Sequence, residues 1–356
     1  MKFTFTRRSS RLAAVLAAAS LLAVTGCSSS DDPGTGSTQT AGSSEAPASE
    51  APVEETSIDL VGFAVIQAAY DDLAAGFAQT DAGAGVTVKG SFGASGAQSR
   101  AVIAGQDADL VALSLTPDVD NIVKEGLIPE DWNTDPQKGI VSDSVVVIAV
   151  RKGNPKNIQG WDDIVKDGVG IVTADPGTSG SAKWNLLGAY THGLGDNNDK
   201  AAAEAYLQQF IDHVVSWNDS GRTATDAFVK GTGDVLISYE NEAIAARAAD
   251  VELDYVVPDS TFLIENPAAT TTDAAQQAKD FLTFVRSDEG QQILVAHGFR
   301  SPFGVEPTAD VVGANDPSDP FPAPARIWTV EDLGGWSVVN DELFGKEDGL
   351  VTQLRG

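Results

Sequence analysis

The sequence has little cysteine, histidine or positive charge, and each shortage excludes a class of function. One cysteine, Cys27, rules out a disulfide within one chain, and three histidines far apart leave no HExxH motif and no Cys/His cluster for zinc. Lysine and arginine number 23 against 51 aspartates and glutamates, a formal charge of −28. This balance argues against a nucleic-acid binder and against a basic membrane-binding surface. We expect no metal site, no cofactor and no nucleic-acid partner.

The first 26 residues read as an export signal. Four basic residues (Lys2, Arg7, Arg8 and Arg11) precede an apolar stretch at 12–24, which is short for a membrane span. The stretch ends in Val-Thr-Gly-Cys, which resembles a bacterial lipobox, where a cysteine after small residues is lipidated and becomes the mature N-terminus. The chain's one cysteine, Cys27, occupies that position. The alternative is an ordinary cleaved signal peptide with an incidental cysteine.

Residues 27–57 are rich in Ser, Pro, Ala, Gly and Glu and have almost nothing to bury. Such a segment predicts a disordered tether. Lipid on Cys27 would hold the protein on a membrane surface without a spanning helix. We therefore expect an extracytoplasmic protein that is lipid-anchored to the cell membrane.

The rest of the chain alternates short apolar runs with helical patterns, which predicts an α/β fold with mostly parallel sheets. About 300 ordered residues favour two lobes over one. Strands are expected at 59–63, 86–89, 109–114, 145–150, 170–173, 234–239, 253–257 and 262–264. Helices are expected at 67–77, 97–103, 118–124, 184–190, 201–210, 241–248 and 276–285.

Ligands in such sheets bind beyond the carboxyl ends of strands, at helix beginnings. Three strand-to-helix junctions, at 91–98, 175–184 and 218–224, are rich in Ser and Gly. Serine supplies a hydroxyl donor, glycine lets the backbone approach a ligand, and the first N–H groups of a helix carry a partial positive charge. One such junction alone is explained by an N-cap and a turn. Three together favour an anion site, and none fits the nucleotide P-loop pattern.

Six segments resemble the sulfate-binding proteins of ABC importers: GASGAQSR (93–100), VRKGNPKNIQGWDDI (150–164), TSGSAKWNLL (178–187), DSGRTAT (219–225), GDVLISYENEA (233–243) and FVRSDEGQQ (284–292). The resemblance implies a two-lobed periplasmic-binding-protein fold (Venus flytrap, type II) that closes on one ion. It also implies a monomer that delivers the ion to the importer's membrane subunits. We expect lobe one at 58–146 plus 259–356, with the C-terminal tail packed on it, and lobe two at 147–258.

In that family neutral donors, mostly backbone N–H groups, hold the dianion without a counter-charge. Carried over residue by residue, the resemblance implies sulfate contacts at Ala64, Ser95, Ser179, Gly180, Ser181, Gly221, Arg222 and Tyr239. The chain departs from the family at several of them. Ala64 stands where Asp is common, and Ser181 where the family often has Gly. Near Gly221 the chain is about one residue shorter, and Tyr239 replaces a frequent Trp. The alternative for Tyr239 is a core aromatic at a strand end.

A site made only of donors suits sulfate, which has no proton at neutral pH. Hydrogen phosphate must donate a hydrogen bond, so it would want a carboxylate in contact. We expect Asp219 to orient its loop and Glu240 to point away or to pair with a cation such as Arg222. Thiosulfate, molybdate, tungstate and phosphate remain alternative ligands.

Two other classes of function are weighed against binding. A secreted serine hydrolase using Ser95 or Ser179 is disfavoured because neither serine lies in a G-x-S-x-G motif. A structural or adhesive lipoprotein would not need three donor-rich junctions. We therefore expect no catalytic residues and a binding protein rather than an enzyme.

Overall fold

A computed structural model describes residues 56–356. The predicted signal peptide, the lipidation site Cys27 and most of the predicted tether lie outside the described residues. The predicted tether is two residues too long, because Thr56 and Ser57 already belong to the first strand. Thr56 pairs there with Val86 of the neighbouring strand.

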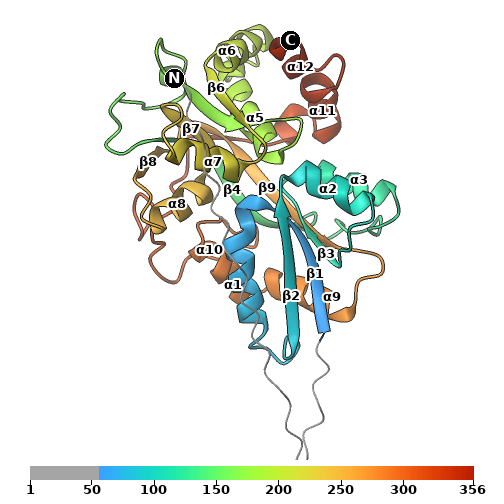
Figure 1. Cartoon of the computed structure of the whole chain (residues 1–356). Helices are drawn as coiled ribbons and strands as arrows, with labels where there is room; N and C mark the ends of the chain where they lie inside the picture. The colour runs from blue at the N-terminus through green and yellow to red at the C-terminus, as the bar shows by residue number, and fades with distance from the viewer. Residues whose placement is uncertain (1–55) are drawn as a thin grey trace, which may run out of the picture. The chain divides into compact units, whose positions relative to one another are not determined.

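Ten strands and twelve α-helices alternate along residues 56–356 (Figure 1). The strands are β1 (Thr56–Phe63), β2 (Val86–Gly93), β3 (Leu110–Ala112), β4 (Ile140–Arg151), β5 (Ile171–Ala174), β6 (Val214–Asn218), β7 (Val235–Tyr239), β8 (Leu253–Val256), β9 (Ser260–Thr270) and β10 (Arg326–Trp328). The α-helices are α1 (Gln67–Phe77), α2 (Ser95–Ile103), α3 (Thr116–Lys124), α4 (Trp161–Ile164), α5 (Gly180–Leu194), α6 (Lys200–Asp212), α7 (Gly221–Val229), α8 (Glu240–Ala248), α9 (Gln276–Arg286), α10 (Asp288–Ala296), α11 (Trp336–Phe344) and α12 (Leu350–Arg355). Two 3₁₀ turns, η1 (Ala64–Ile66) and η2 (Glu331–Leu333), complete the set.

The strands join side by side in the order β2-β1-β3-β9-β4-β7-β5-β6, with β10 on β9 and β8 on β4. β1, β2 and β3 are parallel to one another, as are β5, β6 and β7. β4 and β9 run antiparallel to their neighbours in the middle of this order. The predicted two-lobed α/β fold is confirmed, with a parallel group of strands in each lobe and two antiparallel strands between the groups.

The two long strands β4 and β9 connect the lobes. The first half of β4 pairs with β9, and the second half pairs with β7 and β8. β9 in turn pairs with β4 and then with β3. The predicted lobe boundaries, at 146/147 and 258/259, fall inside β4 and just before β9, and they remain a prediction.

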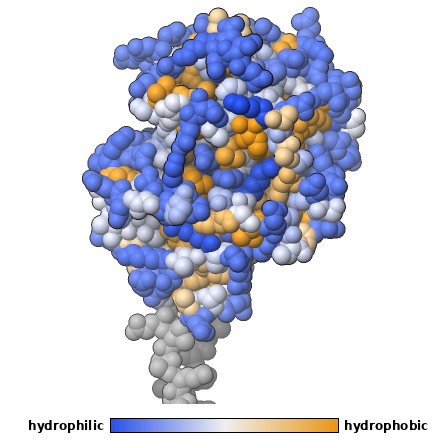
Figure 2. Space-filling view, turned by 180° about the vertical axis from the view of Figure 1, so that it is seen from behind, coloured by the Kyte–Doolittle hydropathy of each residue, from blue (hydrophilic) through white to orange (hydrophobic). Residues whose placement is uncertain are grey.

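The apolar run at 145–150 is buried along its whole length, with exposed fractions of 2% or less. A strand that is covered on both faces reads as a continuous apolar run, which is why β4 could be located from the sequence. α9 shows the other pattern, because only its Ala278, Phe281, Leu282, Phe284 and Val285 are buried. On the face seen from behind in Figure 2, hydrophilic residues predominate, with smaller apolar areas between them.

The C-terminal tail packs on a different part of the molecule from the one expected. The ring of Trp336 in α11 lies 5.0 Å from that of Trp184 in α5. Glu342 in α11 accepts a hydrogen bond from Lys200 at the start of α6, and α12 contacts α6. These helices belong to the predicted lobe two. The expectation that the tail packs on lobe one is therefore wrong for α11 and α12.

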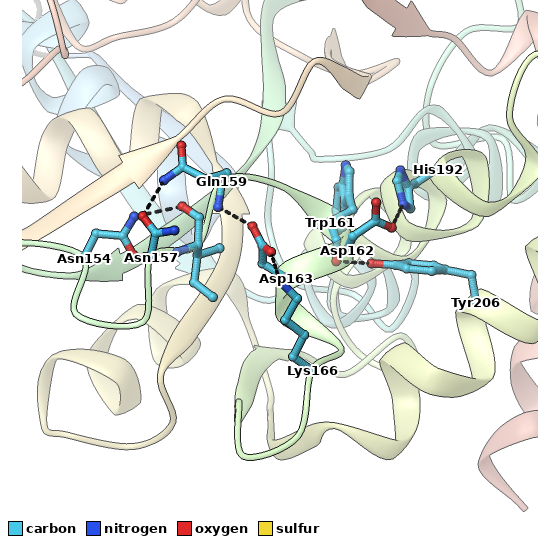
Figure 3. A network of polar contacts seen from close by, with 10 residues as sticks. Asn154, Asn157, Gln159, Trp161, Asp162, Asp163, Lys166, His192 and Tyr206 are labelled. Carbon is cyan, nitrogen blue, oxygen red and sulfur yellow. Dashed lines mark hydrogen bonds and ion pairs between the residues drawn. The ribbon is translucent and has the colours of Figure 1, made fainter.

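The segment 150–164, one of those that carried the resemblance, makes local polar contacts (Figure 3). The side chain of Asn154 donates to the carbonyl oxygen of Ile158 and accepts from its N–H. The carboxylate of Asp162 lies 2.9 Å from His192 of α5, and Tyr206 of α6 donates to the carbonyl oxygen of Trp161. These contacts hold the loop after β4 against α5 and α6, which explains the segment by structure rather than by ligand binding.

None of the helices between residues 56 and 356 combines the length and the apolar character that a membrane crossing requires.

Candidate functional site

A small cavity lies where several strand ends and helix beginnings meet. It is lined by Phe63, Ala64, Val65, Gly93, Ala94, Ser95, Ser114, Ser179, Ser181, Ser220 and Gly221. About 170 Å³ of space lies between these atoms, but none of it is wide enough for a water molecule, so the walls are almost in contact in this structure. The cavity is thus far smaller than the pockets of drug-sized ligands, which measure about 300–1,000 Å³. Among residues 56–356, the lining includes five serines and no charged side chain.

The structure brings five of the eight predicted contact residues onto one cavity wall: Ala64, Ser95, Ser179, Ser181 and Gly221. The other three, Gly180, Arg222 and Tyr239, lie next to wall residues in the chain or behind them. Gly180 is between the two lining serines of α5, and Arg222 follows Gly221. The structure shows that the five lining residues share one location. That any of the eight residues contacts a ligand stays a prediction.

Two of the helices that begin at this cavity have uncapped N-termini. The N-cap residues of α2 and α5, Ala94 and Ser179, make no side-chain capping hydrogen bond. Ser179 carries the hydroxyl that would normally fill this role and leaves the first N–H groups of α5 without it. A turn-and-cap explanation therefore fails at these two junctions. Free N–H groups at helix beginnings are the donors that an anion needs.

The third helix, α7, is capped in the ordinary way. The Ser220 hydroxyl accepts from the N–H of Thr223 at 3.2 Å, and the Thr223 hydroxyl accepts from the N–H of Ser220 at 2.9 Å. This reciprocal pair is a capping box. At this junction the N-cap explanation holds, and Gly221 with its backbone remains the part that faces the cavity.

Tyr239 stands behind the cavity wall, at the end of β7. Its hydroxyl lies 2.7 Å from the Oγ of Ser114, and only 1% of the residue is exposed. Burial raises the pKa of this phenol, so the hydroxyl keeps its proton and can donate. The ring lies 6.2 Å from that of Phe63, another wall residue. Tyr239 is thus both a packed aromatic and a hydroxyl that reaches the wall through Ser114.

Ser114 joins the two sides of the site, and the sequence analysis missed it. Its N–H donates to the Ser95 hydroxyl at 3.0 Å, and its carbonyl oxygen accepts from the indole of Trp184 at 3.0 Å. It follows β3 directly, so it is also a serine at a strand-to-helix junction. It has no glycine beside it, so residues 113–117 lack the Ser-Gly pattern that marks the three predicted junctions. Ser220 also lines the cavity and lies in the predicted junction 218–224, but it is not among the predicted contacts.

A carboxylate contacts a residue of the cavity wall from the side that faces away from the cavity. The Ser95 hydroxyl donates to Asp118 of α3 at 2.5 Å. Burial raises the pKa of Asp118, while the hydrogen bond from Ser95 and the charges of Lys183 and Arg100 act to lower it. Asp118 does not line the small cavity. It orients a wall hydroxyl rather than facing a ligand there.

Two acidic residues were expected not to face the ion, and neither of them lines the cavity. The ion-pair partner of one of them differs from the expected one. Glu240 is fully buried and accepts two hydrogen bonds from Arg300, at 2.7 and 3.1 Å, so the suggested pairing with Arg222 is wrong. Arg222 instead lies 3.3 Å from Glu242, two residues further along α8. Asp219 is exposed, and its carbonyl oxygen accepts from Thr178 at 2.9 Å, which ties two of the junctions together.

Comparison with known proteins agrees with this geometry. A family model described as a bacterial extracellular solute-binding protein matches residues 58–300. The chain is similar to the sulfate-binding protein of Synechococcus elongatus, with 38% identity over 97% of this chain and 96% of that protein. It is also similar to the thiosulfate-binding protein of Escherichia coli, with 32% identity over 78% of this chain and 85% of that one.

Among solved structures, the sulfate-binding protein SubI from Mycobacterium tuberculosis H37Rv shares 42% identity. It superposes with a TM-score of 0.76 and covers 82% of this chain and all of its own. The resemblance predicted from the six sequence segments is therefore confirmed, and the chain belongs to the bacterial extracellular solute-binding proteins.

Proposed function

We propose that this protein captures sulfate in the small cavity between its lobes and delivers it to an ABC importer. The observation that carries the proposal is the donor set. The helices α2 and α5 begin at the cavity without side-chain caps, serine hydroxyls line it, and no carboxylate from the described part of the chain, 56–356, lines it. Sulfate has only acceptors, so donors can satisfy it fully, whereas hydrogen phosphate would leave its proton against another donor. The similarity to two sulfate-binding proteins supports the same choice.

The protein's negative charge does not oppose this function. Exposed charges more than about 8 Å away are largely screened at physiological salt. Oriented amides within a few ångströms set the local field in a closed cavity. Binding then shifts the population from open to closed, because only the closed form brings donors from both lobes onto one ion.

The ligand can be tested by thermal melting. Sulfate at a hundred times its dissociation constant adds about 2.7 kcal/mol of apparent stability. We expect sulfate to raise the melting temperature most in a series with equal concentrations of sulfate, thiosulfate, molybdate and phosphate. A rise with phosphate and none with sulfate would refute the assignment. A larger rise with thiosulfate would move this protein toward its thiosulfate-binding relatives.

We further propose that the protein is a lipoprotein attached through Cys27, with 28–55 as a tether. The lipobox-like Val-Thr-Gly-Cys and the chain's one cysteine support this. In cells labelled with a palmitate analogue, we expect the wild-type protein to carry label and to sediment with membranes. Cys27→Ser should lose the label and appear in the soluble extracytoplasmic fraction. Equal membrane association of both forms would contradict lipid anchoring.

A further inference from the structure

A second, much wider cleft adjoins the small cavity. It holds about 840 Å³ and lies between α2 and α3 on one side and the start of α5 with the C-terminal tail on the other. Ser179 lines both hollows. Gly96 and Gly180 line the cleft, and their chain neighbours Ser95 and Ser181 line the cavity. The cleft therefore lies directly outside the proposed binding site.

Positive charge gathers in this cleft, in a chain that has more than twice as many acids as bases. Five basic residues line it: Arg100, Lys124, Lys183, Lys346 and Arg355. Two acids, Asp118 and Glu125, line it as well. Arg355 is paired with Asp175. The other four basic residues form no ion pair with residues 56–356, although Asp118 acts electrostatically on Arg100 and Lys183. Five basic residues against two acids still leave the lining with an excess of positive charge.

The wall between cleft and cavity is thin. A β-carbon added to Gly96 would lie 3.1 Å from the carbonyl oxygen of Thr178. The beginning of α2 therefore lies close to the loop before α5. Ser95 and Ser179, the chain neighbours of Gly96 and Thr178, line the cavity, so this contact separates the cleft from the cavity.

We propose that Arg100, Lys124 and Lys346, which line this cleft, speed the approach of the anion to the cavity. This inference rests on the proposed function. A groove lined by charge of one sign raises the local concentration of the opposite ion, with gains of about 10–10³ in association rate in strongly steered cases. The chain as a whole carries a formal charge of −28, which repels a dianion. The exposed cations of the cleft therefore offer sulfate its favourable approach.

The test compares two triple variants with the same change in net charge. The first is Arg100→Gln, Lys124→Gln, Lys346→Gln. The control is Lys89→Gln, Lys230→Gln, Lys279→Gln, which removes three exposed cations that line neither hollow and form no ion pair with the described residues. Association and dissociation rates of sulfate are measured by stopped-flow tryptophan fluorescence. Trp184 bonds to the wall residue Ser114 and is the expected reporter. Calorimetry gives the dissociation constant independently.

At about 0.01 M salt, where the Debye length is about 30 Å, we expect the cleft variant to associate roughly 3–10-fold more slowly than the control. The difference should vanish near 1 M chloride, where the Debye length is about 3 Å. Dissociation should be unchanged, so the dissociation constant rises by the same factor. Equal association rates in both variants, or a change confined to dissociation, would overturn this inference. Failure of the wild-type protein to bind sulfate would instead refute the proposed function.

Discussion

Gly180→Ala is expected to raise the dissociation constant for sulfate roughly 10–100-fold while leaving the free protein folded. A β-carbon at this position would lie 2.6 Å from the Oγ of Ser114 and 2.9 Å from Cγ of Leu115. Both neighbours follow β3, whereas Gly180 begins α5 in the other lobe. The added methyl therefore blocks the last step of lobe closure. Overpacking of a tight contact costs about 1–3 kcal/mol, which is about 5–150-fold in affinity.

Stability of the open form should not suffer from this change. Alanine is the best helix former, and Gly180 has no left-handed backbone angle that alanine would resist. The matched control is Gly177→Ala in the same loop, where the nearest atom to the added carbon is Oδ1 of Asp175 at 3.1 Å. Calorimetric titration with sulfate gives the affinity, and melting without sulfate gives the stability. Wild-type affinity in Gly180→Ala would show that the bound state does not use the close approach of α5 to Ser114.

The location of the site could be predicted because it depends on local pattern and on one general rule. Serine and glycine at 91–98, 175–184 and 218–224 mark helix beginnings, and strand ends of an α/β sheet meet at one edge. Ser95 and Ser179 are 84 residues apart in the chain, and Ser179 and Gly221 are 42 residues apart. All three nevertheless line one cavity. Nothing about individual contacts was needed to place them together.

The sequence pattern could not show which side chain bonds to which. Two glutamates in the first turn of α8, Glu240 and Glu242, are equivalent on that evidence, and both are buried. Only the path of the chain at 297–301 brings Arg300 to Glu240, which leaves Glu242 for Arg222. Such partners are decided by tertiary packing between residues far apart in sequence.

The C-terminal tail illustrates the same limit. The tail was expected to pack against the rest of the fold, and Trp336 does pack on Trp184. The choice of lobe depends on where the connection at 297–325 leads the chain, and that stretch has no helix or strand pattern. Because the tail lies against α5, its residues Lys346 and Arg355 reach the cleft and add to its positive charge.

Arg300→Ala should cost about 3–5 kcal/mol of unfolding free energy near pH 8, because it leaves Glu240 buried without its partner. Arg300 is 18% exposed in its side chain, and it also donates to the carbonyl oxygen of Pro322. Asp143, whose backbone pairs with Arg300, has a pKa raised to about 8 by burial and by the nearby charge of Glu265. The variant therefore leaves both Glu240 and Asp143 without the positive charge of Arg300.

The loss of unfolding free energy in this variant should be smaller at pH 5 than at pH 8. A loss caused by an unpaired buried charge depends on pH in this way, whereas a simple loss of packing does not. Burial already raises the pKa of Glu240, and Arg300 opposes that rise. Without Arg300 the folded-state pKa rises further, so the folded protein binds a proton that the unfolded chain does not. The stability of the variant then falls, relative to wild type, as pH increases from the unfolded pKa toward the new folded one. Urea unfolding at pH 5 and pH 8 measures this difference.

Arg326→Ala, at an exposed pair with Asp332, is the control and should cost about 0–1 kcal/mol at both values. Replacing both partners, Arg300→Met with Glu240→Met, should recover part of the loss, since no buried charge remains. An equal cost at both pH values, with no recovery in the double variant, would mean that Arg300 stabilises the protein through its packing and its bonds to the loop at 321–322 rather than by neutralising Glu240.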